Sequence, residues 1–307
     1  MARLHNVLYR AEDLAFRALL GLIRWLPYPR RVALMGWLMA RIIAPLAGYD
    51  RRVRANLAHV WPELPQPEVR RLMRAVPDNV GRTLAEMYSA DEFLGRLADA
   101  SLEGPGVAAL HAAKAANRPI VIVTGHFGNY LAPRAALQAV GLPTGALYNP
   151  MKNPYFNEHY VAAMAQTGEN LFARDRAGYA QLLRYLRAGG TAALLIDQFM
   201  AHGAALTFFG KPAPTALSAA ELALRYDALF IPIYGVRQPD GISFRLIVEN
   251  PIAHSDAHAM TQAANDSLEA ITRRHPEQWF WIHRRWKPAR QARMATRPDE
   301  TPLAKDR

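Results

Sequence analysis

The sequence predicts an α/β protein with a mixed central sheet and helices on both faces, rather than a barrel. Short apolar runs rich in β-branched residues, among them residues 120–123 and 229–236, have the length of buried strands. Stretches with helical periodicity alternate with these runs along the chain of 307 residues. With 51% hydrophobic and 21% charged residues, the chain can build one large core or two smaller ones, and wholesale disorder is excluded.

A buried strand, a turn and a helix are expected in residues 119–133, PIVIVTGHFGNYLAP. The apolar run ends at Thr124 and Gly125, His126 follows at the turn, and a helix is expected over residues 128–140. In open α/β sheets, ligands bind beyond the carboxyl ends of the strands, so His126 is placed for chemistry. The alternative is a partly buried histidine that is satisfied within a loop.

The remaining elements continue this alternation. Strands are expected at residues 102–104, 145–148, 192–196, 229–236 and 242–248. Helices are expected within residues 54–97 and at residues 107–115, 158–166, 177–186, 216–226 and 260–274. Asp197 and Gln198 come directly after one of the strands, which places them at the same edge of the sheet as His126.

The N-terminal region contains two apolar stretches, residues 14–26 and 32–46. Neither offers the uncharged run of about 18–20 residues that a membrane-spanning helix needs. The interrupting arginines are Arg17, Arg24 and Arg41. A secretory signal peptide is not expected, because acidic and basic groups share the first fifteen residues. The stretches, which carry Trp25 and Trp37, predict basic amphipathic helices that lie in a bilayer interface. An ordinary helical hairpin packed on the main domain is the alternative.

These observations divide the chain into three expected parts. Residues 1–50 form the membrane-associating helices, residues 51–290 the α/β domain, and residues 291–307 a disordered tail. The net charge of +11 indicates an acidic partner, such as an anionic membrane surface, an acidic protein or a nucleic acid. Nucleic acid is disfavoured because no recognition motif is present. The lack of cysteine excludes disulfides, thiolate zinc sites and a cysteine nucleophile.

Five motifs occur in a specific order along the chain. They are GHFGN at residues 125–129, NPYF at 153–156, Asp197-Gln198 after a strand, FFGKPA at 208–213 and QWFWIHRRWK at 278–287. In this order they resemble the lipid A lauroyl/myristoyl (late) acyltransferase family, a branch of the lysophospholipid acyltransferase superfamily. The resemblance extends from the N-terminal apolar segment to about Lys287. It implies a membrane-associated O-acyltransferase at the cytoplasmic face of the inner membrane.

The resemblance also implies the substrates of the reaction. A fatty acyl chain would move from a thioester of acyl carrier protein, or of coenzyme A, to a hydroxyl of a membrane lipid. The acceptor would be a lipid A precursor or a lysolipid. We expect neither a metal nor another cofactor. An alcohol is a poor nucleophile near neutral pH, so a base must take its proton as it attacks the thioester, and His126 is the candidate.

One position departs from the pattern of the family. The family has Asp or Glu five residues after the histidine, where it fixes the imidazole tautomer and stabilises the imidazolium, but this chain has Leu131. Asp197 is the best replacement, although it could equally cap the following turn. A catalytically silent relative that binds lipid or a partner, and an accidental or engineered leucine, are the alternatives.

Other polar residues are expected to bind substrate. They are Gly128, Asn129, Asn149, Lys152, Arg174, Gln198, His283, Arg284 and Arg285. Asn149 stands where many relatives have arginine, and Arg174 could equally lie in a solvated loop. The alternation of tryptophans with cations in residues 279–287 could hold phosphates at a membrane surface. Backbone N–H groups of the turn after His126 are expected to stabilise the oxyanion. Phe208 and Phe209 line an acyl channel or belong to the core.

Overall fold

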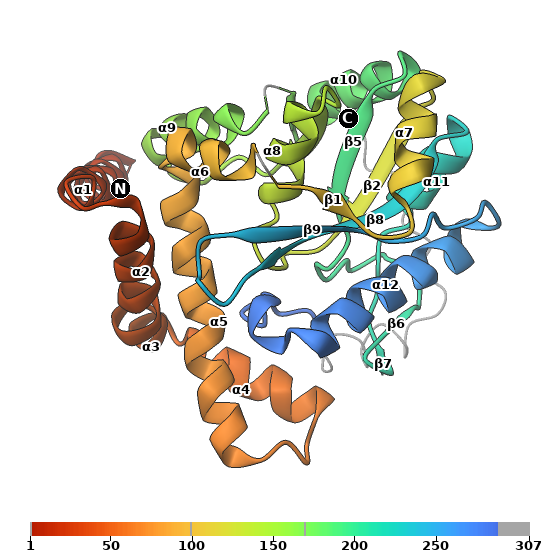
Figure 1. Cartoon of the computed structure of the whole chain (residues 1–307). Coiled ribbons are helices and arrows are strands. Elements are labelled where there is room, and N and C mark those ends of the chain that lie inside the picture. Colours follow the sequence, from red (N-terminus) through yellow and green to blue (C-terminus); the bar gives the residue numbers. More distant parts are fainter. Residues whose placement is uncertain (1, 99, 169, 288–307) are drawn as a thin grey trace.

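The computed structural model describes residues 2–98, 100–168 and 170–287, with side chains from residue 6 onward. Its centre is a seven-stranded sheet in the order β1-β9-β8-β2-β5-β3-β4 (Figure 1). The strands are β1 Leu102–Glu103, β2 Ile120–Thr124, β3 Thr144–Tyr148, β4 Leu171–Ala173, β5 Thr191–Leu195, β8 Leu229–Arg237 and β9 Phe244–Val248. Neighbouring strands are parallel except β8 and β9. The predicted mixed sheet is confirmed.

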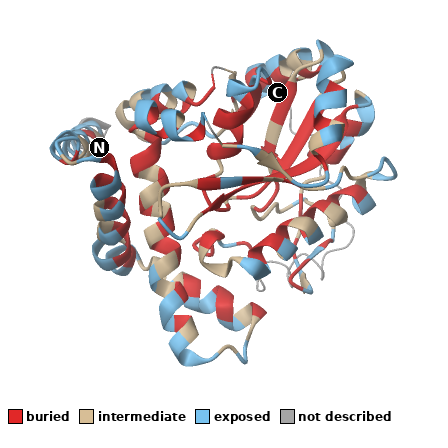
Figure 2. Ribbon diagram, viewed as in Figure 1, coloured by how far each residue is buried: buried red, intermediate tan, exposed pale blue. Residues whose placement is uncertain are grey.

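Helices cover both faces of the sheet, as the sequence predicts. They are α7 Val107–Ala115, α8 Ala132–Ala139, α9 Pro154–Gln166, α10 Arg176–Arg187, α11 Ser218–Arg225 and α12 Ala257–Arg274. Successive side chains of β2 point to opposite faces of the sheet. Ile122 packs with α7 and α8, whereas Val123 packs with α10, α11 and α12. Every residue of β2 is buried, which explains its continuous apolar run (Figure 2).

A helical layer precedes the sheet in the chain. It contains α1 Ala2–Ile23, α2 Tyr28–Leu38, the π-helix η1 Met39–Ile43, α3 Ala44–Ala47, α4 Tyr49–Val60, α5 Gln66–Met87 and α6 Ala90–Leu97. The long helix α5 lies between α2 and the rest of the domain (Figure 1). Val32 and Met35 of α2 are buried, and a Cβ on Gly81 of α5 would come within 2.3 Å of the Met35 carbonyl oxygen. The two helices therefore make close backbone contact.

Within the described residues, no single helix has both the length and the apolar composition that crossing a membrane requires. The pair formed by residues Tyr28–Ala47 and Tyr49–Val60 meets both criteria when taken together, with a bend of 84° between its parts.

The structure differs from the sequence prediction in several places. The helix after His126 begins at Ala132 rather than at residue 128, because Gly128 has a φ of +55° that belongs to a turn. The short strand β4 was not expected, and the FFGK turn joins a small hairpin of β6 Thr207–Phe208 and β7 Lys211–Pro212. The predicted tail at residues 291–307 lies outside the described residues.

The C-terminal aromatic motif is core rather than surface. Three tryptophans follow the short 3-10 helix η2 Pro276–Gln278, and all three are buried together with Phe208 and Phe209: Trp279, Trp281 and Trp286. The tryptophans are therefore not part of a surface that could hold phosphates at a membrane. Their burial packs residues 279–286 against α4 and α5 and places His283 beside His126.

Candidate active site

His126 and Asp197 come together because their strands are parallel neighbours. Strand β2 pairs with β5 in a register that places Thr124 opposite Leu195, so both chains leave the sheet at the same edge. The Nδ1 atom of His126 lies 2.8 Å from Oδ1 of Asp197. The other oxygen, Oδ2, accepts the backbone N–H of His126 at 2.8 Å and the indole N–H of Trp279 at 3.0 Å. Asp197 is thus bonded to the histidine rather than capping the next turn.

The surroundings keep Asp197 ionised. Burial alone would raise the pKa of this carboxyl, but the His126 imidazole and the hydrogen bonds from His126 outweigh burial and hold its pKa well below the usual range. A carboxylate accepting from Nδ1–H favours the imidazole tautomer whose Nε2 carries a lone pair. The arrangement therefore leaves Nε2 of His126 free to take a proton and stabilises the imidazolium that results.

A cavity of about 490 Å³ opens beside His126. Its inner walls are mostly apolar and come from β2, β3, β5, β8 and α8, with Ile122, Leu137, Ala146, Ala193 and Ile233 among them. Four polar side chains predicted to bind substrate also line it, and of these Asn149, Lys152 and Arg174 are exposed and Gln198 is partly buried. The cavity thus combines an apolar interior with a polar and cationic opening.

Leu131 belongs to the wall of this cavity. It precedes the first residue of α8, is only 2% exposed, and packs in a core cluster with Ala132 and Ala135. At the position where the family resemblance implies a carboxylate, this chain therefore has an apolar contact surface. The carboxylate that reaches the imidazole is that of Asp197, which follows β5.

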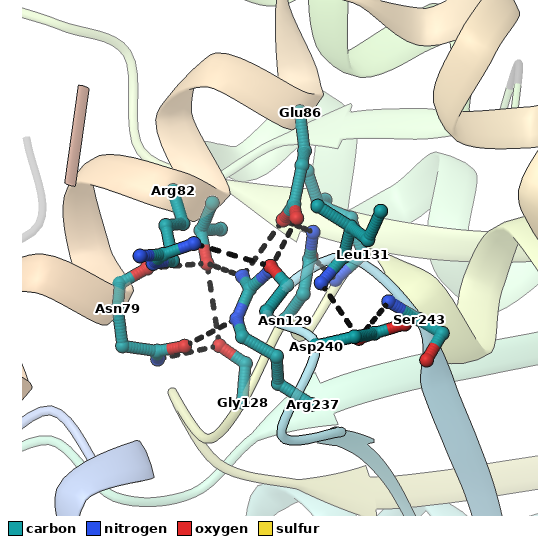
Figure 3. Close-up of polar contacts among 12 residues, drawn as sticks. Asn79, Arg82, Glu86, Gly128, Asn129, Leu131, Arg237, Asp240 and Ser243 are labelled. Carbon is teal, nitrogen blue, oxygen red and sulfur yellow. Dashed lines mark hydrogen bonds and ion pairs between the residues drawn. The ribbon is translucent and has the colours of Figure 1, made fainter. Parts of the chain in front are cut away.

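A buried polar network holds the turn after His126 (Figure 3). The Gly128 carbonyl accepts from Asn79 Nδ2 at 2.9 Å and from Thr83 Oγ1 at 3.3 Å, both on α5. Asn129 Nδ2 donates to Glu86 Oε2 at 2.7 Å, and Arg237 Nη2 donates to the same oxygen at 2.8 Å. The guanidinium also donates to Oε1 of Glu86, and its Nε donates to Asn79 at 2.8 Å. Helix α5 and strand β8 thus fix the backbone that carries the histidine.

Two residues that were predicted to bind substrate, Asn129 and Gly128, instead hold the turn in place. Asn129 is fully buried, and its side chain is used by Glu86 and by the backbone N–H of Leu131. A Cβ at Gly128 would lie 1.8 Å from the Gly235 carbonyl oxygen, so this glycine permits close contact between the turn and β8. Sequence reasoning missed Glu86 and Arg237, since a buried pair between a helix and a distant strand leaves no local pattern.

The predicted C-terminal ligands have different positions. Arg285 is fully buried and donates to the Pro214 carbonyl at 2.8 Å and to Thr215 Oγ1 at 2.7 Å, so it is not available to a phosphate. Arg284 is exposed. The ring of His283 lies 4.6 Å from the ring of His126, and burial lowers the pKa of His283 to about 4, which keeps it neutral at physiological pH.

Three side chains have donor atoms at metal-binding spacing. Single ligand atoms of His126, Asp197 and His283 lie within 4.8 Å of one another. However, both oxygens of Asp197 already accept hydrogen bonds from His126 and Trp279, which a metal ion would have to replace. These contacts fit a histidine held for proton transfer better than a metal centre.

Comparison with known proteins identifies the family to which this chain belongs. Residues 3–288 match the model of the bacterial lipid A biosynthesis acyltransferases. The chain belongs to this family. It is therefore an acyltransferase, as the order of its motifs predicts. It is 26% identical over 294 residues to the lipid A biosynthesis lauroyltransferase of Escherichia coli (strain K12), covering 92% of this chain and 91% of the relative.

Two further members are similar over most of their length. A lipid A biosynthesis acyltransferase of Haemophilus influenzae is 22% identical over 275 residues, which is 85% of this chain and 83% of that protein. A phosphatidylinositol mannoside acyltransferase of Mycobacterium tuberculosis is 24% identical over 261 residues, which is 81% of this chain and 82% of that protein. The names of these relatives differ in the acceptor lipid and agree on acyl transfer.

Proposed function

We propose that this acyltransferase moves a fatty acyl chain from a carrier thioester to a hydroxyl of a lipid A precursor or a related lysolipid. The contact between His126 Nδ1 and Asp197 at the edge of an apolar cavity carries the proposal. A base whose Nε2 is free and whose Nδ1 is bonded to a buried carboxylate is what alcohol activation requires. Acyl carrier protein, or coenzyme A, is the proposed carrier.

The reaction follows from these positions. The acceptor oxygen attacks the thioester carbonyl carbon while Nε2 of His126 takes the hydroxyl proton, and the carbonyl π electrons move to oxygen. The tetrahedral intermediate then collapses, the C–S bond breaks and its electron pair leaves with sulfur. The proton on His126 passes to the thiolate, which releases an ester and a thiol. Asp197 stabilises the imidazolium between these two steps.

The cavity offers separate places for the polar and apolar parts of a lipid substrate. The walls from β2, β3 and α8 suit an acyl chain, because burying each methylene contributes roughly 0.8 kcal/mol. Lys152 and Arg174 at the opening suit phosphate groups, and Asn149 and Gln198 offer hydrogen bonds. We propose Arg284 and His283 as further substrate ligands near this cavity, although its lining does not include them.

The N-terminal helices support a membrane location for this reaction. Trp25 is 90% exposed, Leu46 is 83% exposed, and Leu22 is also exposed. Such side chains beside arginines favour an anionic bilayer surface. We place the protein at the cytoplasmic face of the inner membrane, where the resemblance locates its relatives.

An acyl-transfer assay tests the proposal. Purified protein would receive radiolabelled lauroyl-acyl carrier protein or lauroyl-coenzyme A, with a lipid A precursor or a lysophospholipid as acceptor. We expect a labelled lipid product, and His126→Ala should lower kcat by roughly 10²–10⁴ with little change in folding. If the His126→Ala variant turns over as fast as the wild type, His126 is not the base. A lipid profile of cells with and without the protein would identify the natural acceptor.

A further inference from the structure

The oxyanion formed during thioester attack needs a hydrogen-bond donor, and four backbone N–H groups of the His126 turn already donate to acceptors within the protein. The N–H groups of Phe127, Gly128 and Asn129 donate to the carbonyls of Gly125, Gln278 and Gly235 at 2.8, 2.9 and 3.3 Å. The N–H of Leu131 donates to Asn129 Oδ1 at 2.8 Å. The expectation that backbone N–H groups of this turn bind the oxyanion is therefore wrong for these four groups.

A second cavity identifies the side chains next to the reacting atoms. It has a volume of about 170 Å³ and lies between α5 and the turn, with Val80, Leu84, Met87 and Phe280 in its walls. His126, Tyr130 and Tyr160 line both this cavity and the larger one. A reaction that joins two substrates at His126 has its reacting atoms where the two cavities meet. The two tyrosines are therefore at that junction together with the base.

The two phenols are bonded to each other beside the histidine. The ring of Tyr130 contacts the ring of His126 edge-on, with centroids 5.3 Å apart. Burial raises the pKa of both phenols, and their mutual hydrogen bond raises the pKa of Tyr130 further while it acts to lower that of Tyr160. Both phenols are therefore protonated at working pH, so each can act as a hydrogen-bond donor.

We propose that the Tyr160 hydroxyl, which lies with Tyr130 and His126 in both cavities, donates a hydrogen bond to the thioester carbonyl oxygen as negative charge develops on it. The assignment rests on the proposed acyl transfer. Thr124 and Gln198 line the larger cavity alone, and His283 lines neither of the two cavities described. Of these donors, the tyrosine pair is the one that shares both cavities with the base. Donors fixed before the reaction contribute most when they face the position of developing charge.

Steady-state kinetics with lauroyl-acyl carrier protein and a lipid A precursor test the assignment. Tyr160→Phe keeps the ring and removes one hydroxyl, so kcat should fall roughly 10²–10³-fold while KM and the thermal unfolding midpoint change little. Tyr130→Phe should give a smaller loss, because the Tyr160 hydroxyl is still present. Tyr155→Phe is the matched control on the same helix, since its hydroxyl accepts from Arg10 on α1, and kcat should stay at the wild-type value.

Three results would overturn the assignment. The first is a Tyr160→Phe kcat within about threefold of the wild type while His126→Ala is inactive. The second is a loss that appears as a raised KM with unchanged kcat, which indicates ground-state binding. The third is a shifted acid limb of the kcat/KM profile in Tyr160→Phe, which would mean that the phenol tunes His126. A wild-type protein without transfer activity would overturn the proposed function itself, and the assignment with it.

Discussion

At the scale of single residues, a carboxylate can serve a histidine from any neighbouring segment, because what matters is its distance from Nδ1 and its alignment with the Nδ1–H bond. Here the carboxylate follows β5 and lies 2.8 Å from the imidazole, whereas position 131 contributes a buried leucine to the cavity wall. The sequence could suggest Asp197 because parallel strands end at one edge of a sheet. It could not show the Trp279 bond that completes the set of donors to this carboxylate.

Substitutions at positions 197 and 131 test which of the two candidate positions provides the carboxylate for His126. Asp197→Asn should lower kcat roughly 10³–10⁴-fold, because an amide no longer fixes the tautomer or stabilises the imidazolium. Leu131→Asp should not raise kcat, and it should lower the free energy of unfolding by about 1–3 kcal/mol, because its carboxyl enters an apolar wall. Both variants are measured by lauroyl transfer and urea unfolding. A tenfold gain in kcat from Leu131→Asp would instead show that position 131 still serves the base.

The lowered pKa of His283 predicts how the free energy of unfolding depends on pH. Its pKa falls from 6.5 to about 4 on folding, so the unfolded chain binds a proton between these values that the folded chain does not. Stability should therefore decrease as pH falls from about 6.5 to 4, by up to about 3 kcal/mol from this group. His283→Gln should flatten that part of the curve, measured by urea unfolding at intervals of pH. A variant whose stability falls as steeply as that of the wild type would place the titration on another group.

At the scale of elements, the strands of the main sheet other than β4 were predictable to within two residues, because they are short, apolar and punctuated by turn residues. The bounds of the helices α7 and α10 were predictable to within one residue. The start of α8 was not predictable, since the turn at Gly128 depends on close contact with Gly235 in β8. The tryptophan motif was misassigned for a related reason. Its alternation with cations resembles an interface pattern, whereas the contacts of Trp279 and Trp281 are with distant core residues.

The pair between Glu86 and Arg237 should dominate the stability of the turn. Arg237→Met leaves a buried carboxylate without its cation, and we expect a loss of about 3–5 kcal/mol in the free energy of unfolding. The double variant Glu86→Leu with Arg237→Met removes both charges and should be more stable than the single variant. Arg245→Met is the matched control on the adjacent strand β9, because its pair with Glu103 is exposed. Equal losses in Arg237→Met and Arg245→Met would show that the buried network does not hold the turn.

At the scale of the whole molecule, most of the large exposed apolar side chains lie on the N-terminal helices α1 to α3 or next to them. Figure 2 shows α2 exposed on its outer side and buried on its inner side, whereas most of α1 is exposed. The net charge of +11 was readable from composition, but the position of Lys152 and Arg174 at the opening of the apolar cavity required the fold. The N-terminal helices are also part of the folded domain, because Val32 and Met35 are buried against α5.

Membrane association is best tested without removing these helices, because deleting residues 1–50 would uncover the buried face of α5. The triple variant Leu22→Ser, Trp25→Ser and Leu46→Ser changes exposed side chains alone. It should sediment with phosphatidylglycerol vesicles at least tenfold less than the wild type, because less apolar surface enters the interface. Raised salt should release the wild type only partly, since apolar burial is not screened as charge is. The control Val140→Ser with Leu224→Ser alters exposed apolar side chains on α11 and after α8, and it should sediment like the wild type. Equal sedimentation of the triple and control variants would mean that α1 to α3 are not the membrane surface.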